Sequence, residues 1–587
     1  MKCPNHRTNW RRPLCVLTQI ASFSFIATAL SGCHGGDDDL EPPSVIAQTC
    51  TAKSISALNV SNVTITAATA IPASGALPAH CQVTGSVVTE GDGGPQGHAN
   101  FAVYLPTKWN QKFLFNGNAG FDGNVQPASA EQLSKGYATA AGDAGHLGNG
   151  AGFVGNLDSS FAVSSDGTRN DATVTDYFYR ANHQVSVAAK QIVRGYYGSH
   201  ERFSYMQGCS GGGREGLMAA SVYPDDYDGI VAGNAYSSQA ATSIWNVRNF
   251  KAFLAAPISN DKFDAINAAV LKQCDAADGV SDGLIQNPSA CNFDATSLVS
   301  DGTLTAAQAA ALNDYFTAVK DDAGNVIAHG GSVSGLNVIS PSSNGPSSNI
   351  LGLGAHTAND LVVANANSYL PWSGGSITTQ PVDWQLAYGV VAMLGFHQPT
   401  FNMTNPAFIN GNVINSAVSQ QLFSAVQGGS LTNPSQLASF IDKGKKLIIY
   451  DGFADAVLNP FDKVDIYKSL AGANGGYENL KKTVRFFPVP EMQHCVGGSG
   501  PNSFDALTAL DQWVEGGKAP DSILATKYAN DDPAASVQRT MPLCPFPAKA
   551  AYSGSGNVND AANWSCPSLD QSLLHLGPNG VRAGLSQ

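Results

Sequence analysis

The pattern Gly-x-Ser-x-Gly at residues 208–212 constrains the fold of this chain more than any other feature. A short apolar stretch, residues 202–206, precedes it, and residues 214–222 have the composition of a helix that ends before Pro224. In the order strand, motif, helix, the pattern is typical of a nucleophile elbow, a turn so tight that the neighbours of the serine must be glycines. The sequence therefore predicts an α/β fold with Ser210 as the catalytic nucleophile.

A serine nucleophile needs a general base and an orienting carboxylate, which follow it in α/β-hydrolases in the order Asp or Glu, then His. A buried-strand pattern at residues 446–450 leads to two candidates, Asp451 at the strand end and Asp455 in the next loop. We favour Asp455, because the acid of this fold usually reaches its histidine from that loop. His494 is the predicted base, since it lies in a glycine-flanked loop directly after the strand pattern of residues 483–487.

Ester chemistry also needs hydrogen-bond donors for the negative charge that develops on the attacked carbonyl oxygen. The backbone amide of Gly211 follows the nucleophile and begins a helix, so it is one predicted donor. A strand pattern at residues 112–115 leads to a glycine-rich loop at residues 116–123, which should supply the other. We favour Gly120 for this role, with Ala119 as the alternative.

The N-terminus has the pattern of an export signal. Basic residues precede an uncharged, mostly apolar run at residues 14–30, which is too short and too weakly flanked to indicate a membrane span. The run ends in Leu-Ser-Gly-Cys, which resembles a bacterial lipobox with Cys33 as the lipid anchor. We expect residues 1–32 to be the signal peptide and residues 33–48 to form a polar tether. The alternative is a plain secretory signal with a chance cysteine; both predict an exported protein that is periplasmic, an outer-membrane lipoprotein or extracellular.

Export makes disulfides possible, and the number of cysteines is consistent with them. Of the 11 cysteines, Cys3 and Cys15 would leave with the signal and Cys33 would be lipidated, so an even number remains. Local spacing favours three pairs: Cys50 with Cys81, Cys274 with Cys291, and Cys544 with Cys566.

Cys209 and Cys495 are left over, and each is next to a predicted catalytic residue, Ser210 and His494. A bond between these cysteines would hold the nucleophile and the base in register. The alternative is two free, buried thiols.

The charge balance excludes some partners. The net charge is −13 and no basic stripe is visible, so we expect no nucleic acid to bind. Lys and Arg are absent from Asp321 to Asp442, so a pocket built there must recognise its ligand without a cationic side chain.

Four segments of the chain resemble the tannase and feruloyl esterase family, which also contains hydrolases of terephthalate half-esters: residues 208–216, 223–233, 451–455 and 492–495. The resemblance extends from about Cys50 to Cys566. It implies a disulfide between Cys209 and Cys495, and it implies that the acid is at the position of Asp455. It also implies an α/β-hydrolase core with a large inserted lid; we assign the core to residues 49–235 and 441–587 and the lid to residues 236–440.

An acidic segment in the predicted lid, residues 274–284, has the hard oxygen ligands that Ca²⁺ prefers. It resembles the calcium loop of this family, whose ligands would be the side chains of Asp275, Asp278 and Asp282 and the carbonyls of Val280 and Leu284. The alternative is a solvated acidic turn closed by a disulfide. The ion would be structural, because the sequence shows little else to order residues 270–295.

The predicted function is that of an exported serine esterase acting through an acyl-enzyme on small esters of aromatic, phenolic acids, such as galloyl or feruloyl esters. Hydrolases of terephthalate half-esters resemble this chain but use a lid arginine, and this lid has no arginine after Arg248. A calcium-dependent surface binding protein on the same scaffold is the alternative from another class. Several lid residues could stack on an aromatic ring: Tyr369, Trp372, Trp384, Tyr388, Met393 and Phe396.

Overall fold

The computed structural model describes residues 49–150, 152–258, 260–336, 382–568 and 570–574. The predicted signal peptide and tether, with Cys33, lie outside these ranges, as do Tyr369 and Trp372. Within them, no helix has both the length and the apolar character that a membrane span requires.

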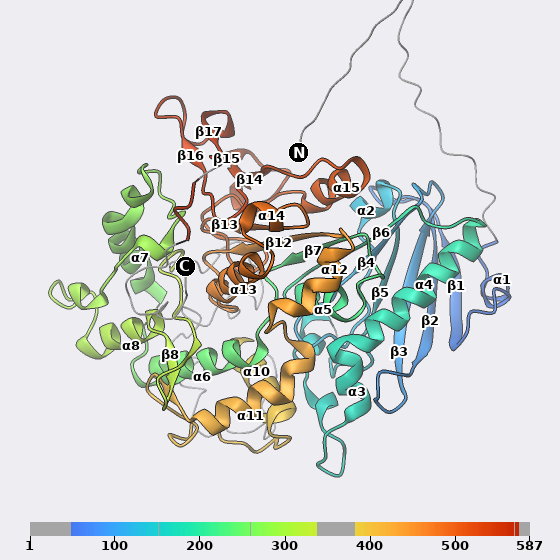
Figure 1. Ribbon diagram of the computed structural model, residues 1–587, viewed down its shortest axis with the longest axis horizontal. Coiled ribbons are helices and arrows are strands. Elements are labelled where there is room, and N and C mark those ends of the chain that lie inside the picture. Colours follow the sequence, from blue (N-terminus) through green and yellow to red (C-terminus); the bar gives the residue numbers. More distant parts are fainter. Residues whose placement is uncertain (1–48, 151, 259, 337–381, 569, 575–587) are drawn as a thin grey trace, which may run out of the picture. The chain divides into compact units, whose positions relative to one another are not determined.

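A nine-stranded sheet forms the centre of the fold, in the order β1-β2-β3-β5-β4-β6-β7-β12-β13 (Figure 1). Neighbouring strands are antiparallel from β1 to β5 and parallel from β5 to β13. This arrangement is that of an α/β fold with an antiparallel edge. The strands are β1 (Val63–Ile71), β2 (His80–Thr89), β3 (Gly97–Pro106), β4 (Lys112–Asn116), β5 (Ala138–Gly142), β6 (Phe203–Cys209), β7 (Gly229–Gly233), β12 (Lys446–Gly452) and β13 (Val484–Val489).

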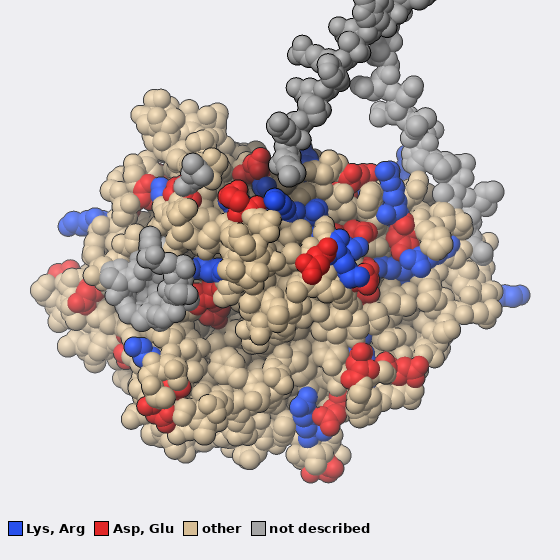
Figure 2. Space-filling view, in the orientation of Figure 1, with Lys and Arg blue, Asp and Glu red and all other residues tan. Residues whose placement is uncertain are grey.

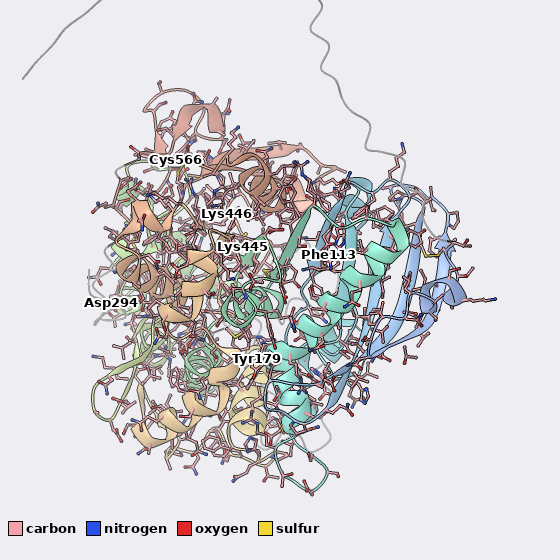
Figure 3. The ribbon with its side chains drawn as sticks, turned by 45° about the vertical axis from the view of Figure 1, so that its right-hand side comes forward. Phe113, Tyr179, Asp294, Lys445, Lys446 and Cys566 are labelled. Carbon is pink, nitrogen blue, oxygen red and sulfur yellow. A yellow bond between two sulfur atoms is a disulfide. The ribbon has the colours of Figure 1, made fainter. Side chains whose placement is uncertain are left out.

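Helices cover both faces of the sheet because its central strands are apolar on both sides. On β4, Phe113 and Phe115 pack in the core with α4 (Ala181–Tyr197), α5 (Gly211–Val222) and α13 (Pro460–Ala473). Leu114, between them, packs on the other face with α15 (Ala506–Gly516). The ammonium of Lys190, on α4, lies 5.5 Å from the ring centroid of Phe113, which is labelled in Figure 3.

The strand and helix predictions around the motif differ from the structure mainly at their ends. The strand predicted at residues 202–206 extends to Cys209, because its pairing with β7 continues to that residue. The helix predicted from residue 214 begins at Gly211, because the serine turn leads directly into it.

The segment between β7 and β12 contributes no strand to the nine-stranded sheet in its described parts. It has its own four-stranded sheet, and its apolar side chains around Trp245 and Tyr315 form a cluster that also includes Phe121, Tyr177 and Phe178 of the core. Its elements are α6 (Gln239–Ala255), α7 (Asn260–Cys274), α8 (Ala306–Phe316), β8 (Val319–Asp321), β9 (Val326–Ala328), α10 (Val382–Tyr388), β10 (Ile409–Asn410), β11 (Val413–Ile414), α11 (Ser416–Val426) and α12 (Ala438–Asp442).

Three of the lid residues that could stack on an aromatic ring are buried in this apolar cluster: Trp384, Tyr388 and Met393. The ring of Trp384 lies 4.2 Å from that of Phe250, centroid to centroid. Phe396 stacks on Phe401 at 4.3 Å. These aromatic groups stabilise the inserted segment.

The remaining elements are short and lie outside the central sheet. They are α1 (Ala52–Ser56), α2 (Ala130–Ser134), α3 (Asp171–Thr175), α14 (Tyr477–Leu480), β14 (Ile523–Tyr528), β15 (Val537–Leu543), β16 (Ala551–Tyr552) and β17 (Trp564–Ser565). On the face shown in Figure 2, acidic and basic side chains are interspersed, and no basic stripe is visible.

Candidate active site

Ser210 lies on the turn between β6 and α5 in a strained backbone conformation. Its φ is 63° and its ψ is −120°, values that are costly for a residue other than glycine. Two hydrogen bonds hold it there: its N–H donates to the Gly233 carbonyl (2.9 Å) and its carbonyl accepts from the N–H of Tyr236 (3.1 Å). The end of β7 and the segment that follows it therefore fix the nucleophile turn.

The glycines after Ser210 allow the start of α5 to approach the glycine-rich loop closely. A Cβ on Gly211 would lie 2.6 Å from the Gly120 carbonyl oxygen, and one on Gly212 would lie 2.6 Å from that of Asn118. The N–H of Gly212 donates to this Asn118 oxygen at 2.7 Å. Any side chain here would separate the glycine-rich loop from the start of α5.

The His494 imidazole is hydrogen-bonded to a carboxylate. Its Nδ1 lies 2.8 Å from Oδ2 of Asp455, which is fully buried. The other Asp455 oxygen accepts backbone N–H groups from Val457 (2.8 Å) and Leu458 (2.9 Å), and the Asn234 side chain donates to Oδ2 at 2.8 Å. Burial raises the pKa of Asp455, but the charge and hydrogen bond of His494 and the charge of Lys463 outweigh it, so the pKa is lowered overall.

Asp451, the other candidate acid, has a different environment. Its carboxylate is fully buried and forms an ion pair with Lys463 at 3.2 Å. Burial raises its pKa well above the ordinary value, although Lys463 opposes the shift. Of the two aspartates, Asp455 is the one hydrogen-bonded to His494. Lys445 and Lys446, labelled in Figure 3, mark the opposite, amino end of β12.

The described residues form four disulfides, with the pairs Cys50–Cys81, Cys209–Cys495, Cys274–Cys291 and Cys544–Cys566. The Cys209–Cys495 bond spans 286 residues and brings the two Cα atoms to 6.0 Å. It thereby holds the residue before Ser210 beside the residue after His494.

Ser210 and His494 line one cavity of about 460 Å³, which we call the catalytic cavity. No Lys, Arg, Asp or Glu of the described chain lines it. The lining residues are Asn116, Gly117, Asn118, Ala119, Gln126, Pro127, Ser129, Gln132, Cys209, Ser210, His494 and Cys495.

The predicted oxyanion donors lie side by side. A Cβ on Gly211 would be 3.0 Å from the Gly120 nitrogen. In the described ranges, neither of these two amides has a hydrogen-bond acceptor in the protein. The N–H of Ala119, the alternative, donates to its neighbour, the Asn118 side chain, at 3.1 Å. The Gly120 and Gly211 amides are therefore the better pair for an oxyanion.

Sequence reasoning missed the buried charged residues that support this loop. The Glu215 carboxylate accepts the N–H of Asn118 at 2.9 Å, and Arg214 forms a buried ion pair with Asp122 at 3.3 Å. Burial raises the pKa of Asp122 well above its usual range, and the nearby Glu215 raises it further. The adjacent charged residues Arg214 and Glu215, in an otherwise apolar helix, were the sequence feature that could have indicated this support.

The predicted calcium segment is a loop whose carboxylates bind its own backbone. Asp275 accepts N–H groups from Asp282 and Gly283, both at 3.1 Å, and Asp278 accepts that of Gln286 at 3.1 Å. Burial raises the pKa of Asp278 to about 6. In the part of the chain that the structure covers, no three Asp, Glu, His or Cys side chains converge as a metal site.

Contacts from outside the lid also hold this loop, which the sequence did not indicate. Arg539 forms an ion pair with the Asp282 carboxylate at 2.8 Å. Lys549 donates to the Asp278 carbonyl at 2.8 Å, and Glu491 accepts the N–H of Ile285 at 3.3 Å. Residues outside the lid therefore contribute to the order of the acidic loop.

A serine on a strained strand–helix turn, with a hydrogen-bonded His–Asp pair at the same cavity, defines a serine hydrolase of the α/β-hydrolase class. The family model described as tannase and feruloyl esterase matches residues 81–567. The chain belongs to this family and is a carboxylic ester hydrolase of the serine type.

Individual relatives agree with this assignment. The chain is 31% identical to an uncharacterized esterase of Xanthomonas campestris, over 87% of this chain and 90% of that protein. It is also 31% identical to mono(2-hydroxyethyl) terephthalate hydrolase of Piscinibacter sakaiensis, over 85% of this chain and 87% of that protein. Its fold is similar to the crystal structure of feruloyl esterase B from Aspergillus oryzae, with a TM-score of 0.70, 23% identity, and coverage of 87% and 98%.

Proposed function

We propose that this protein is an exported esterase that hydrolyses carboxylic esters of aromatic, phenolic acids, such as galloyl or feruloyl esters. The observation that supports this most is the absence of any charged side chain among the described residues of the catalytic cavity. A neutral aromatic ester needs no ion-pair partner, and the family is described by esterases of this kind.

The proposed mechanism uses the contacts around Ser210. The serine oxygen attacks the ester carbonyl while His494 takes the serine proton through Nε2, because Nδ1 is held by Asp455 at 2.8 Å. The Gly120 and Gly211 amides stabilise the oxyanion. His494 then donates the proton to the leaving alcohol, and an acyl-enzyme remains. Water, activated by His494, releases the acid.

A negatively charged acyl group, as in a terephthalate half-ester, is a poorer fit. The Arg248 guanidinium is buried and donates to the carbonyls of Thr317 (2.9 Å) and Tyr315 (3.4 Å). Lys251 donates to the carbonyl of Ile409. Both cations are thus used inside the inserted segment, and the sequence has no Lys or Arg at all from Asp321 to Asp442.

A panel of four esters tests this proposal: methyl gallate, methyl ferulate, a terephthalate half-ester and p-nitrophenyl acetate. We expect turnover of the phenolic methyl esters, and a loss of at least about 10³-fold in kcat for Ser210→Ala with unchanged circular dichroism. A preference for the half-ester would reject the proposal that the acyl group of the substrate is neutral. Turnover retained by Ser210→Ala would reject the nucleophile.

We also propose that residues 275–284 bind a structural Ca²⁺ ion. Three carboxylates within eight residues, two of them with pKa values raised by burial, are the hard and partly desolvated donors that such a cation stabilises. The ligands would be the side chains of Asp275, Asp278 and Asp282, with the carbonyls of Val280 and Leu284. The ion would supply rigidity to the loop and would take no part in the ester chemistry.

Finally, we propose that a lipid on Cys33 anchors the chain after export. The support is the sequence pattern alone. In cells that express the full chain, Cys33→Ser should move the protein from the membrane fraction to the soluble fraction. An unchanged distribution would reject the anchor.

A further inference from the structure

We propose that Asp122 and Glu215 share one proton, and that this buried pair positions the Gly120 amide for the oxyanion. Asp122 belongs to the glycine-rich loop and Glu215 to α5. This inference rests on the proposed oxyanion donors and adds the residues that hold them in place. The described residues that line the catalytic cavity include neither of the two, so both are positioning residues.

Each of the two carboxyl groups has one oxygen with a donor and one without. Oδ2 of Asp122 accepts from the Arg214 guanidinium at 3.3 Å, and Oε2 of Glu215 accepts the N–H of Asn118 at 2.9 Å. The other two oxygens, Asp122 Oδ1 and Glu215 Oε1, are buried, and no donor among the described residues reaches them. A buried carboxylate oxygen without a donor is costly and needs an explanation.

A proton between these two oxygens supplies the missing donor. Asp122 is then a carboxylic acid, and its hydroxyl donates to Oε1 of Glu215. Burial raises the pKa of Asp122 well above its usual range, and the charge of Glu215 raises it further, although Arg214 opposes the shift. A hydrogen bond between the two carboxyl groups raises the pKa of Asp122 as well.

The charges of the site balance when the pair holds a single proton. Asp122 and Arg214 are fully buried, and Glu215 is only 4% exposed. With one proton, the pair carries one negative charge, which equals the positive charge of Arg214. Without it, the excess negative charge would face another carboxyl group, that of Asp143. Two carboxyl groups that share a buried site do not both ionise readily.

The other titratable groups around the pair cannot supply this proton. Both oxygens of Asp143 accept from Asn100, at 3.0 Å from the backbone and 2.6 Å from the side chain, and burial raises its pKa to about 6. The ring of Tyr177 faces the Arg214 guanidinium at 4.1 Å, and burial raises its pKa. Burial lowers the pKa of His146 to about 4, so that this imidazole is neutral near pH 7.

The pair connects the two segments that carry the oxyanion donors. Gly120 lies between Asn118 and Asp122 in the glycine-rich loop, and Gly211 is the first residue of α5. Glu215, one helical turn after Gly211, holds the loop at Asn118 through a backbone N–H and at Asp122 through the proton. The loop is therefore attached to α5 on both sides of Gly120, and the distance between the two donor amides depends on the pair.

Loss of the proton would remove one of these two attachments. The carboxylates would repel each other, and the end of the loop at Asp122 would move away from α5. A displaced amide stabilises the oxyanion less, whereas binding of the neutral ester does not depend on it. The effect should therefore fall on kcat and leave KM almost unchanged.

Infrared difference spectroscopy tests the proton directly. At neutral pH, the spectrum of the wild-type protein minus that of Asp122→Asn should contain the carbonyl band of one protonated carboxyl group, with the shift in D₂O that such a group shows. Glu215→Gln, which donates to Asp122, should remove the same band. The matched control is Asp176→Asn: Asp176 is fully buried beside Arg180, but both of its oxygens have donors, so no such band should be lost. If neither Asp122→Asn nor Glu215→Gln removes a band, the shared proton is rejected.

Kinetics with p-nitrophenyl acetate test the positioning role. An Asn at position 122 can donate to Glu215 as the carboxylic acid does, so Asp122→Asn should lower kcat by no more than about threefold. Asp122→Ala removes this hydrogen bond and should lower kcat about 10²-fold, with KM within about threefold of the wild-type value. Equal losses of kcat in the two variants, or a loss confined to KM, would reject the positioning role.

The dependence of kcat on pH is a second measurement that does not require the alanine variant to fold. In the wild-type protein kcat should fall at alkaline pH as the pair loses its proton, and Asp122→Asn should abolish this fall, because an amide does not titrate. Identical alkaline profiles for the two proteins would reject the coupling between the proton and the rate. If folded wild-type protein does not hydrolyse p-nitrophenyl acetate, the proposed esterase function fails, while the infrared spectra still decide whether the proton is shared.

Discussion

Two regions of this protein, the catalytic site and the acidic loop, are each held by a disulfide. The two bonds differ in the number of residues that separate their cysteines. Cys209–Cys495 joins residues 286 apart, next to Ser210 and His494. Cys274–Cys291 joins residues 17 apart and closes the acidic loop. The long-range bond sets the relative position of two segments that must react together. The short-range bond only limits the freedom of one loop. We therefore expect the first to affect the rate of hydrolysis and the second to affect mainly stability.

The two regions are connected by one buried carboxyl group. Glu491 precedes His494 by three residues, and it accepts the N–H of Ile285, just after the acidic loop, at 3.3 Å. The Ser499 hydroxyl donates to its other oxygen at 3.2 Å. Burial raises the pKa of Glu491 to about 7. Four changes to the protein test whether the two disulfides differ in this way.

Removing the long-range bond should have the largest effect. In Cys209→Ala/Cys495→Ala we expect kcat to fall about 10²-fold, since a displacement of about 1 Å between reacting groups costs this much. The loop-entropy model adds a loss of about 6 kcal/mol in the free energy of unfolding for a separation of 286 residues. Steady-state kinetics and urea titration measure the two effects. An unchanged kcat would show that packing alone keeps the loops in register.

Removing the short-range bond should lower the free energy of unfolding and leave the rate of hydrolysis almost unchanged. Cys274→Ala/Cys291→Ala should lower the free energy of unfolding by about 3 kcal/mol for a separation of 17 residues. We expect kcat at 25 °C to stay within about twofold of the wild-type value. A fall in kcat as large as that of the other double variant would contradict the expectation that only the long-range bond affects the rate.

Calcium removal tests the acidic loop by another route. The purified mature chain should contain one calcium per molecule by mass spectrometry, and chelation should lower stability by about 2 to 3 kcal/mol. Asp275→Asn/Asp278→Asn should abolish both the calcium content and the response to chelator. Asp264→Asn, an exposed aspartate on α7, is the control and should change neither. A metal-free wild-type protein that ignores chelator would reject the site.

The smallest expected effect concerns pH. Because the pKa of Glu491 is about 7 in the folded protein and near 4.5 when unfolded, the folded state holds the proton more tightly. The contribution of Glu491 to the stability of the fold is complete below about pH 4.5 and is lost as the pH rises through about 7. Between pH 5 and 8 we expect a loss of about 2 kcal/mol. Glu491→Gln should remove this dependence, measured by urea titration at each pH; an unchanged slope would assign the loss to other groups.

Local patterns predicted much of this site because the features concerned depend on only a few neighbouring residues. The order strand, Gly-x-Ser-x-Gly, helix predicts the turn at Ser210 from neighbouring residues, and the short cysteine spacings limited the possible pairs. The apolar strand patterns ahead of the Asp455 and His494 loops were visible for the same reason.

Other features depended on contacts between distant segments. The sequence left Asp451 and Asp455 as alternatives, and only the folded chain brings one of them to 2.8 Å from His494. The sequence did not show which groups Arg248 contacts, and only packing shows its guanidinium directed to carbonyls of the inserted segment.

The sequence by itself thus determined the class of fold, the serine turn and the set of cysteines, because backbone geometry and periodicity are local properties. Tertiary structure decided which carboxylate meets the histidine, which cations are already paired, and which buried carboxyl groups support the glycine-rich loop. These are side-chain contacts across long stretches of chain. No local sequence pattern predicts these contacts, because they form only when the folded sheet brings the distant segments together.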